Sequence, residues 1–358
     1  MQENILDVHV RRIVHHLGLT GLLYTLIKLA FWRGFHLDNT TTVRTIQVTE
    51  KSSDQRLDNF LLRELKGIPR TRIYRLIRRG EVRVNKKRAK PETRLTAGDK
   101  VRIPPLHLPD SPELPKPSPG LIGLLEQSIL HEDHNLLVLN KPPGLAVHQG
   151  TGIRLGLIEA IRQIRSDWRD AELAHRLDRD TSGVLVVCKN SRTLRNMQGQ
   201  FKEKRIEKRY HALVQGRWPD TVSEIKAPLT RVLAESGERF VRVDPAGKPS
   251  TTRFAILEQF PSATLLEATP VTGRTHQIRV HCQQAGHPIL GDSKYGLLAR
   301  GEKDKSGTEA AAKYLCLHAA ELQFLLPGTD SLFQVSAPWD KSFSAQVSRL
   351  REILSNSD

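Results

Sequence analysis

Apolar residues recur at helical intervals in two adjacent segments near the start of the chain. Asp54 precedes the first segment and is placed to cap the helix that follows. Pro69 opens the second helix, and Gly80 ends it. Short runs with alternating apolar residues follow at 82–84 and 101–103 and predict strands. We therefore expect a small α/β unit in this part of the chain.

Apolar runs and helical patterns alternate again in the much longer C-terminal part. Five runs predict strands, at 136–139, 184–187, 207–214, 241–257 and 263–268. Two stretches with helical spacing predict helices, at 158–164 and 194–201. The last two strands are expected to run antiparallel. Periodicity alone therefore predicts an α+β fold.

The length of the chain, 358 residues, is too great for one ordinary domain. Seven prolines lie among polar residues between Pro104 and Pro119 and predict a semi-rigid, extended linker. We therefore divide the chain into four segments: an N-terminal extension at 1–45, a small domain at 46–104, a linker at 105–124 and a larger domain at 125–358.

The N-terminal extension is rich in apolar residues between Leu17 and Trp32, but this stretch is too short to span a membrane and contains Lys28. The start of the chain, with Glu3 and Asp7, lacks a basic segment, and no small-residue cleavage site follows the apolar stretch, which argues against a signal peptide. Three interpretations remain open: an amphipathic helix on the domain or a partner, a weak membrane-surface helix, or residues translated from a start codon placed too far upstream. We expect the extension to be dispensable, so a chain that starts near Thr42 should keep its activity.

Positive charge is concentrated in the small domain. The whole chain has a formal net charge of +16, and the stretch from Asp54 to Pro104 has 16 Lys or Arg residues against 6 Asp or Glu residues. Such a density is typical of a surface that contacts phosphates, and it predicts steep salt dependence of binding. Only Phe60 and Tyr74 are aromatic here, so contact to the backbone and shape of a structured RNA is favoured over base stacking. The candidate contacts are Arg72, Arg75, Arg79, Lys86, Lys87 and Arg88.

The cysteines show no pattern of disulfide or metal binding. Cys188, Cys282 and Cys316 are scattered and odd in number, which is typical of a protein in the reducing cytoplasm. No Cys-x-x-Cys pair occurs in the sequence. We expect neither a metal nor a small-molecule cofactor.

One stretch, from Ala174 to Lys189, concentrates groups that support chemistry. Two aspartates, two arginines, a histidine and a Thr-Ser-Gly turn precede an apolar, β-branched run. The run predicts a buried strand, so the polar half is a loop held rigidly at the N-terminal end of that strand. A core strand needs no such charged cluster. The loop is therefore either a surface loop with ion pairs or part of an active site.

Nine consecutive residues of this stretch, His175 to Gly183, resemble the signature of the RluA-type pseudouridine synthases. The resemblance implies that Asp178 is the catalytic carboxylate. It also implies an active-site tyrosine at Tyr210, which lies in a Lys-x-Tyr context, and an arginine at Arg279 that pairs with the carboxylate.

The resemblance extends over most of the chain, about residues 46–345, with further matches at 286–292 and 317–319. Within the small domain, the segments 56–61 and 80–85 are similar to an S4 domain, a small RNA-binding module. The fold implied is α+β: an N-terminal S4 (αL-like) RNA-binding domain, followed by a pseudouridine synthase domain with a central mixed, mostly antiparallel sheet.

The chemistry implied by the resemblance is an isomerisation. The N1–C1′ bond of uridine breaks, the uracil turns, and C5 bonds to C1′. Asp178 would either attack C1′ or remove the 2′ proton, and Arg279 would keep it ionised. Tyr210 would stack on the uracil, and its hydroxyl, or a water that it positions, would help to remove the C5 proton. Such a reaction has no redox step and requires no cofactor.

The target base must leave its stack before it can react. Arg176 lies on the same loop as the catalytic carboxylate and is placed to fill the vacated space. His175 is expected to brace the loop, and it is also a candidate contact to the substrate. Arg274 and Gln277 belong to the third family motif and are further candidate contacts to RNA.

The partner implied by the resemblance is 23S ribosomal RNA, free or in a pre-50S assembly intermediate, with modification at uridines 955, 2504 and 2580. A D-type rRNA target or a tRNA target is the close alternative within the family. A non-catalytic S4 RNA-binding protein and a peripheral membrane protein are alternatives from other classes. We expect a cytoplasmic monomer that does not associate with membranes.

Overall fold

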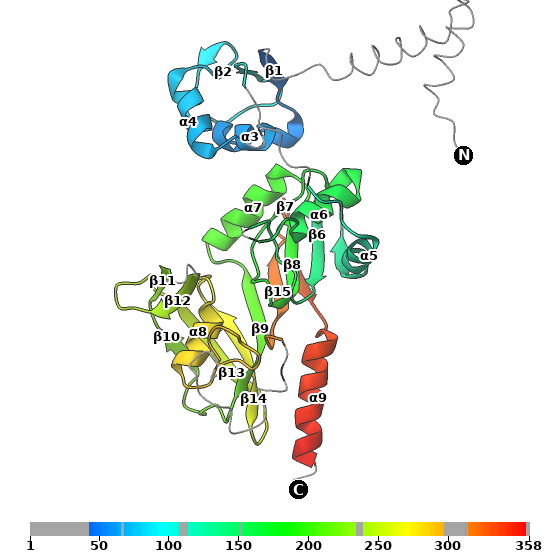
Figure 1. Ribbon diagram of the computed structural model, residues 1–358, viewed down its shortest axis with the longest axis vertical. Coiled ribbons are helices and arrows are strands. Elements are labelled where there is room, and N and C mark those ends of the chain that lie inside the picture. Colours follow the sequence, from blue (N-terminus) through cyan, green and yellow to red (C-terminus); the bar gives the residue numbers. More distant parts are fainter. Residues whose placement is uncertain are drawn as a thin grey trace, which may run out of the picture. The chain divides into compact units, whose positions relative to one another are not determined.

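The structure is a computed structural model that describes residues 43–65, 68–106, 114–150, 152–233, 239–296, 312 and 314–355. Contacts within the chain divide these residues into two compact units, one that ends at residue 106 and one that starts at residue 114 (Figure 1). The apolar stretch at 17–32 lies outside the described residues, so its three interpretations stay open. None of the described helices is long and apolar enough to cross a membrane.

The smaller unit combines two helices with a short sheet. Four strands of its described residues pair antiparallel in the order β1 (Arg44–Gln47), β4 (Lys100–Ile103), β2 (Arg83–Val84) and β3 (Lys87–Arg88). A 3-10 turn, η1 (Glu50–Ser52), precedes the helices α3 (Leu57–Glu64) and α4 (Arg70–Arg79). Leu57, Phe60 and Ile73 are among the buried residues that join both helices to the sheet. The predicted α/β unit is therefore present.

The ends of the two helices differ in how well the sequence predicts them. Gly80 ends α4 in the left-handed conformation with φ 71°, as predicted. Asp54 does not cap α3, because the N-cap is Arg56 and Asp54 turns the chain at φ 61°. Arg94 binds the Asp54 carboxylate at 3.3 Å and holds it away from the helix. The prediction of a cap at Asp54 is therefore wrong.

The larger unit is built on one wide sheet. Ten strands of its described residues form this sheet, and eight of them lie in the spatial order β10 (Glu224–Lys226), β13 (Thr251–Gln259), β14 (Ala263–Pro270), β9 (Glu207–Gln215), β15 (Leu317–Leu325), β8 (Ser182–Cys188), β6 (Leu136–Lys141) and β5 (Ile129–Glu132). The other two are β16 (Leu332–Ser336), beside β15, and β7 (Glu172–Leu173), beside β8. Only β8 and β15 pair in parallel among these strands. The sheet is therefore mixed and mostly antiparallel, as expected.

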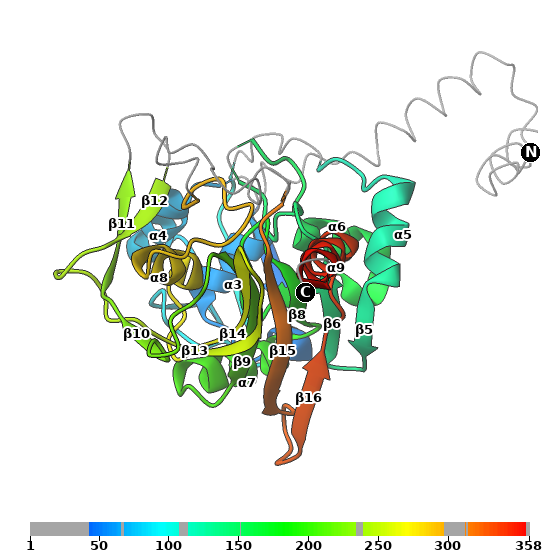
Figure 2. The same cartoon turned by 90° about the horizontal axis from the view of Figure 1, so that it is seen from below.

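Helices cover both faces of the β6–β8 half of this sheet. The helices of the larger unit are α5 (Pro119–Gln127), α6 (Leu157–Ile164), η2 (Ser166–Trp168), α7 (Ser191–Lys202), α8 (Gln277–Gln284) and α9 (Lys341–Ser355). Leu185 and Val187 face a core that includes α6, whereas Val184 and Val186 face a core that includes α7. Figure 2 shows α6 and α7 on opposite sides of the sheet. Both sides of β8 are therefore buried, which explains its unbroken apolar run.

The run at 241–257 is not one strand. It contains β12 (Arg239–Val243) and β13, which are separated by a turn. The turn includes Pro245 and Pro249, which lack the N–H group that a sheet needs. The strand β12 pairs with β11 (Leu229–Leu233), while β13 joins the main sheet. Similarly, α5 begins at Pro119, inside the segment 105–124 that the sequence predicts as a linker.

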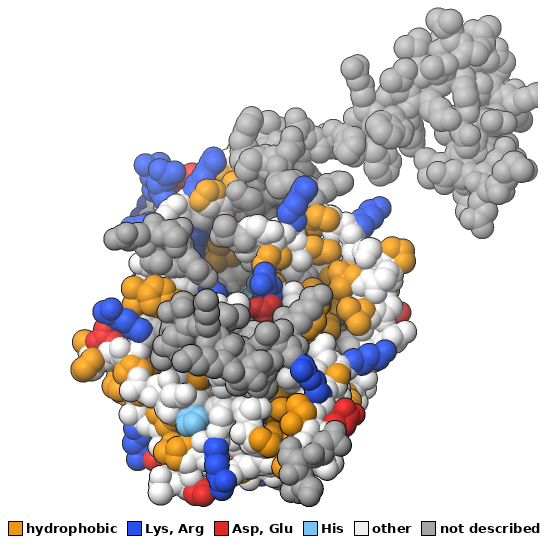
Figure 3. Space-filling model, turned by 60° about the horizontal axis from the view of Figure 1, so that its bottom comes forward, with side chains coloured by type: hydrophobic (Ala, Val, Ile, Leu, Met, Phe, Trp, Pro, Cys, Tyr) orange, Lys and Arg blue, Asp and Glu red, His pale blue; other side chains and the backbone are white. Residues whose placement is uncertain are grey.

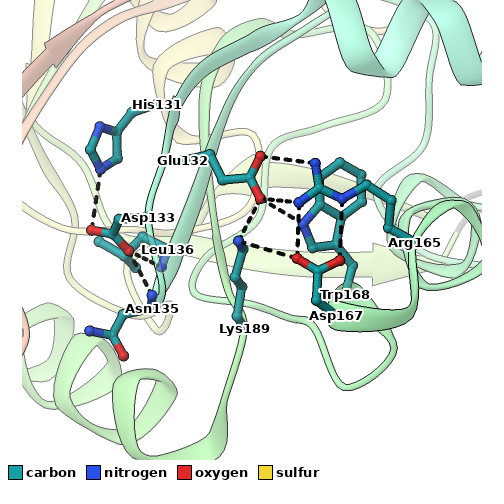
Figure 4. Close-up of polar contacts among 9 residues, drawn as sticks. All are labelled: His131, Glu132, Asp133, Asn135, Leu136, Arg165, Asp167, Trp168 and Lys189. Carbon is teal, nitrogen blue, oxygen red and sulfur yellow. Dashed lines mark hydrogen bonds and ion pairs between the residues drawn. The ribbon is translucent and has the colours of Figure 1, made fainter.

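A cluster of ion pairs ties the edge of this sheet together (Figure 4). Glu132, at the end of β5, accepts hydrogen bonds from Lys189 Nζ at 2.5 Å, Arg165 Nη2 at 2.5 Å and Trp168 Nε1 at 3.0 Å. The Arg165 guanidinium also lies 4.0 Å from the centre of the Trp168 ring. Burial alone would raise the pKa of Glu132, but these donors lower it below its ordinary value. The cluster therefore ties η2 to the end of β5 and to Lys189, which follows β8.

Candidate active site

A cleft of about 360 Å³ opens in the larger unit where the loop before β8 meets the loop before α8. The residues that line it include all three predicted catalytic residues, Asp178, Tyr210 and Arg279. They come from three separate parts of the chain: the central motif, the strand β9 and the helix α8. The fold therefore brings the three family motifs to one place.

The loop that carries Asp178 is held by the start of β8. Ser182 and Gly183 pair with His318 and Ala319 of β15 in the parallel register. A Cβ atom on Gly183 would lie 2.2 Å from the carbonyl oxygen of Ala319, and the φ of Gly183 is 105°. Only glycine fits this close approach. The strand therefore begins at a fixed point, immediately after the loop.

A buried lysine secures the same loop from the other side. Lys141, which is fully buried, donates hydrogen bonds from Nζ to the carbonyl oxygens of Arg179 at 2.8 Å, Pro142 at 2.8 Å and Leu145 at 2.9 Å. Burial lowers the pKa of Lys141 to about 7, although nearby carboxylates oppose this shift. One side chain thus joins the turn after β6 to the residue that follows Asp178.

His175 also holds this loop in place. Its Nε2 accepts a hydrogen bond from the backbone N–H of Val186 at 3.1 Å, and its ring packs on Phe201 at 5.2 Å. Burial lowers the pKa of His175 to about 4, so the ring is neutral at pH 7. The bracing function predicted from the sequence agrees with these contacts.

Arg279 lies between two carboxylates. Its Nε and Nη2 bind the two oxygens of Asp292 at 2.8 Å each, and its Nη1 lies 3.3 Å from Oδ2 of Asp178. The Arg279 side chain is 5% exposed, the Asp292 side chain 0% and the Asp178 side chain 29%. Burial works against the charge of Arg279, but Asp292 and then Asp178 raise its pKa above the ordinary value. The cleft therefore has a permanent cation beside a carboxylate that solvent can reach.

Tyr210 lines the same cleft from β9. Its backbone pairs with Ala268 on one side and Ala319 on the other, so its position in the sheet is fixed. Burial, and then the charge of Asp178, raise the pKa of the Tyr210 hydroxyl above its ordinary value. The hydroxyl is therefore protonated at neutral pH, and Asp178 is close enough to influence it.

Three residues of this network were not singled out in the sequence: His276, Asp292 and Tyr295. His276 precedes α8 with a left-handed φ of 53°, and its Nε2 lies 3.7 Å from Oδ2 of Asp178. Its Nδ1 lies 2.7 Å from the hydroxyl of Tyr295. Asp292 accepts hydrogen bonds from the backbone N–H groups of Lys294 and Tyr295 at 2.9 and 3.0 Å. The only signal for these residues is that they fall in or near the segments that resemble the family.

The other predicted RNA contacts in the cleft differ in exposure and in how many hydrogen bonds their side chains already make within the protein. Arg176 is exposed, and none of the described residues binds its side chain. Arg274 is exposed and donates one hydrogen bond to the carbonyl of Pro249 at 3.3 Å. Gln277 is buried, and its amide already bonds to Thr272, Arg274, Thr251 and Thr252. Gln277 therefore braces the loop before α8 and has little capacity left for RNA.

The predicted cationic residues of the smaller unit form two groups. Arg75 and Arg79 line a hollow of about 410 Å³ on α4, together with Thr71 and Arg78. Arg72 lies on the same helix outside this hollow. The hairpin of β2 and β3 presents Lys86, Lys87 and Arg88 to solvent. Figure 3 shows Lys and Arg side chains scattered over one face of the molecule, with Asp and Glu side chains interspersed among them.

Metal binding receives no support from the arrangement of side chains. No three His, Cys, Asp or Glu residues among those described lie close enough to hold a metal ion. The three cysteines are buried as free thiols, Cys282 and Cys316 in one hydrophobic cluster and Cys188 in another.

Comparison with known proteins identifies both units. Residues 135–284 match the family described as RNA pseudouridylate synthase, and residues 55–101 match the S4 domain. Ribosomal large subunit pseudouridine synthase C of Escherichia coli (strain K12) is 49% identical over 315 residues, which cover 87% of this chain and 98% of that protein. The protein of the same name from Pasteurella multocida (strain Pm70) is 48% identical over 316 residues, 87% of this chain and 94% of its own.

Solved structures agree with this comparison. Human RNA Pseudouridylate Synthase Domain Containing 4 matches with a TM-score of 0.55 and 27% sequence identity, over 65% of this chain and 96% of that chain. Human RNA Pseudouridylate Synthase Domain Containing 1 matches with a TM-score of 0.52 and 27% identity, over 67% of this chain and 98% of that chain.

Proposed function

Because the chain belongs to the RNA pseudouridylate synthase family and is an RNA pseudouridine synthase with an S4 domain, we propose that its substrate is large-subunit ribosomal RNA. The observation that carries this proposal is the 49% identity to ribosomal large subunit pseudouridine synthase C along 98% of that protein. The similarity includes both units, so it covers the RNA-binding part as well as the catalytic part. We further propose uridines 955, 2504 and 2580 of 23S rRNA as the targets.

In this proposal Asp178 is the catalytic carboxylate. Positive charge develops on the ribose as the N1–C1′ bond breaks, and a carboxylate beside C1′ stabilises it. Attack on C1′ and removal of the 2′ proton both need the ionised form of Asp178. Arg279 favours that form because its guanidinium lies 3.3 Å from Oδ2 and is itself held by Asp292.

Tyr210 acts on the base. The face of its ring can stack on an extruded uracil within the cleft. Since its hydroxyl keeps its proton at neutral pH, it serves as a hydrogen-bond donor or holds a water for the final proton transfer from C5. The free side chain of Arg176 occupies the gap that the extruded nucleotide leaves in the RNA.

Affinity for RNA comes mainly from phosphate contacts. The exposed cations of the smaller unit, Arg72, Arg75, Arg79, Lys86, Lys87 and Arg88, supply most of these contacts in our proposal, with Arg274 at the cleft. The binding step and the isomerisation step therefore depend on different residues.

The test is tritium release from a 23S rRNA fragment that contains 5-tritiated uridine. Asp178→Ala should abolish release and leave the Kd for the fragment within about twofold, because affinity rests on phosphate contacts. Asp180→Ala is the matched control, since Asp180 lies on the same loop and its carboxylate, among the described residues, accepts a hydrogen bond from the neighbouring Arg179 at 3.0 Å and none from another side chain. Full activity of Asp178→Ala would falsify the catalytic assignment.

The substrate is tested separately from the catalytic residue. Wild-type protein should modify the large-subunit fragment and leave a tRNA transcript unmodified, and sequencing of pseudouridines in rRNA from a deletion strain should show loss at the three proposed uridines. Modification of tRNA instead, or loss at other rRNA uridines, would replace the proposed target with the alternative within the family. Binding without release from any RNA would mean a protein that only binds RNA.

A further inference from the structure

A chain of hydrogen bonds behind Asp178 has no assigned role in the reaction. The backbone N–H of Val241 donates to the Tyr295 hydroxyl oxygen at 2.8 Å, and the same oxygen lies 2.7 Å from Nδ1 of His276. Nε2 of His276 in turn lies 3.7 Å from Oδ2 of Asp178. This series of polar contacts therefore runs from the two-stranded β11–β12 ribbon, through the interior, to the carboxylate in the cleft.

The donors and acceptors in this chain fix its direction. The Tyr295 oxygen already accepts one hydrogen bond from Val241, and between this hydroxyl and Nδ1 of His276 either group can be the donor; if Tyr295 O–H donates, Nδ1 is the acceptor. If Nδ1 carried the proton instead, the lone pair of Nε2 would face a carboxylate oxygen, and two acceptors would repel. The arrangement that satisfies every group has Tyr295 O–H donating to Nδ1 and the proton of His276 on Nε2, toward Asp178.

We propose that His276 is a positioning residue that donates from Nε2 to Oδ2 of Asp178, and that Tyr295 holds it in the required tautomer. The distance of 3.7 Å is longer than a hydrogen bond, as is common in catalytic sites without substrate, and it should shorten when the substrate binds. The inference rests on the proposed catalytic role of Asp178.

The backbone at His276 supports a functional reason for its placement. A φ of 53° is uncommon for a residue other than glycine, and it places the ring at the start of α8 beside the cleft. Other contacts hold Tyr295, the next member of this hydrogen-bond chain, in place. Asp292, which anchors Arg279, also holds the backbone of Tyr295 at 3.0 Å, and the guanidinium of Arg279 lies 5.0 Å from the centre of the Tyr295 ring.

The proposal assigns different roles to the two oxygens of Asp178. Arg279 and His276 both approach Oδ2, whereas no described residue hydrogen-bonds Oδ1. Two donors on one oxygen fix the rotation of the carboxylate about its Cβ–Cγ bond. Oδ1 is then the oxygen that faces the ribose, and its direction is set before the substrate arrives.

The tautomer can be measured without any substrate. Long-range ¹H–¹⁵N NMR of the full chain with ¹⁵N-labelled histidine distinguishes the Nε2–H form from the Nδ1–H form, and His276→Gln assigns the signal among the 14 histidines. We expect the Nε2–H form in the wild type and a mixture of both forms in Tyr295→Phe. An Nδ1–H form in the wild type would overturn the proposal.

Single-turnover kinetics of isomerisation, measured on an unmodified RNA substrate, test the effect on catalysis. Tyr295→Phe and His276→Leu should each lower the rate constant about 10- to 100-fold, the range expected for loss of a hydrogen bond to a charged group, with the Kd for RNA unchanged. His276→Gln should recover part of the rate, because its amide N–H can reach the place of Nε2. The double variant Tyr295→Phe/His276→Leu should react no more slowly than His276→Leu, since both residues act through one contact.

Additive losses in the double variant would mean that Tyr295 acts independently of His276, and a wild-type rate for Tyr295→Phe would mean that the tautomer has no effect. Either result overturns the proposal. An error in the proposed substrate would be recognised separately. If the wild type isomerises tRNA but not rRNA, the same rates can be compared on tRNA. The NMR result does not depend on RNA at all.

Discussion

The buried carboxylate of Asp292 offers the sharpest test of what holds the cleft together. Asp292→Asn keeps the shape of the side chain but removes its charge. The amide N–H₂ group must then face either Nε or Nη2 of Arg279, each of which is a donor now 2.8 Å from an oxygen. Arg279, which is 5% exposed, would keep one hydrogen bond to the amide oxygen and the longer contact to Asp178. An almost fully buried guanidinium thus loses one hydrogen bond and one of its two charged partners.

The size of the effect follows from burial. Removal of one partner from a buried ion pair lowers the free energy of unfolding by about 3–5 kcal/mol, and the remaining contact to Asp178 favours the lower end of this range. For a domain the size of the larger unit, 3 kcal/mol corresponds to a fall in Tm of roughly 6–12 °C. Pseudouridine formation should fall as well, because an Arg279 that is no longer held at both Nε and Nη2 positions the Asp178 carboxylate less firmly.

Urea unfolding followed by tryptophan fluorescence measures this loss. Three of the four tryptophans, Trp168, Trp218 and Trp339, lie in the larger unit, so most of the signal reports on that unit. Glu258→Gln is the matched control. It breaks a similar two-pronged pair with Arg351, at 3.0 and 2.7 Å, but the two side chains are 28% and 52% exposed and the loss should stay below about 1 kcal/mol. If Asp292→Asn is no less stable than this control, burial of the pair does not stabilise the cleft.

Two further changes test the loop anchor and the RNA surface. Burial places the pKa of Lys141 near 7, below its value in the unfolded chain, so the unfolded state binds more protons above pH 7 and the free energy of unfolding should rise from pH 7 toward pH 10. Lys141→Met should lose this rise and lower stability at pH 7, as measured by urea titration at each pH; an unchanged pH profile contradicts the assignment. Arg75→Ala should weaken binding to all RNA sequences and reduce the slope of log Kd against log salt by about one, as measured by filter binding, without changing the rate at saturating RNA. An unchanged slope would remove Arg75 from the phosphate contacts.

The central motif could be recognised from the sequence because its information is local. A charged loop and the buried strand β8 are consecutive in the chain, so one nine-residue string is enough to single out Asp178. The partners of that residue lie about a hundred residues away and meet it only through the fold, so Arg279 was predicted only from the family resemblance and His276 was not predicted. Asp292 and Tyr295 were missed for the same reason: their function is visible only in contacts with residues of other elements.

Local rules also fail where a distant residue competes with them. Asp54 stands in a suitable place for a helix cap, but Arg94 binds its carboxylate from 40 residues away. Gln277 has the polarity expected of an RNA contact, yet Thr272, Thr251 and Thr252 use its hydrogen-bonding groups. In both cases the residue type indicated a polar contact, but the residue that makes this contact could not be predicted from the sequence.

The position of β15 has a consequence for how the chain folds during synthesis. Among the described strands, β15 is the one that lies between β9 and β8 and joins the two halves of the main sheet, although it comes late in the chain, at Leu317–Leu325. While a ribosome is still translating the residues before it, Asp178 and Tyr210 belong to sheet fragments that have no shared edge. Pairing across such a long stretch of sequence is slow. A nascent chain should therefore acquire its catalytic geometry only when nearly all of it has emerged, so a truncation before residue 317 should leave a protein without a cleft rather than a weaker enzyme.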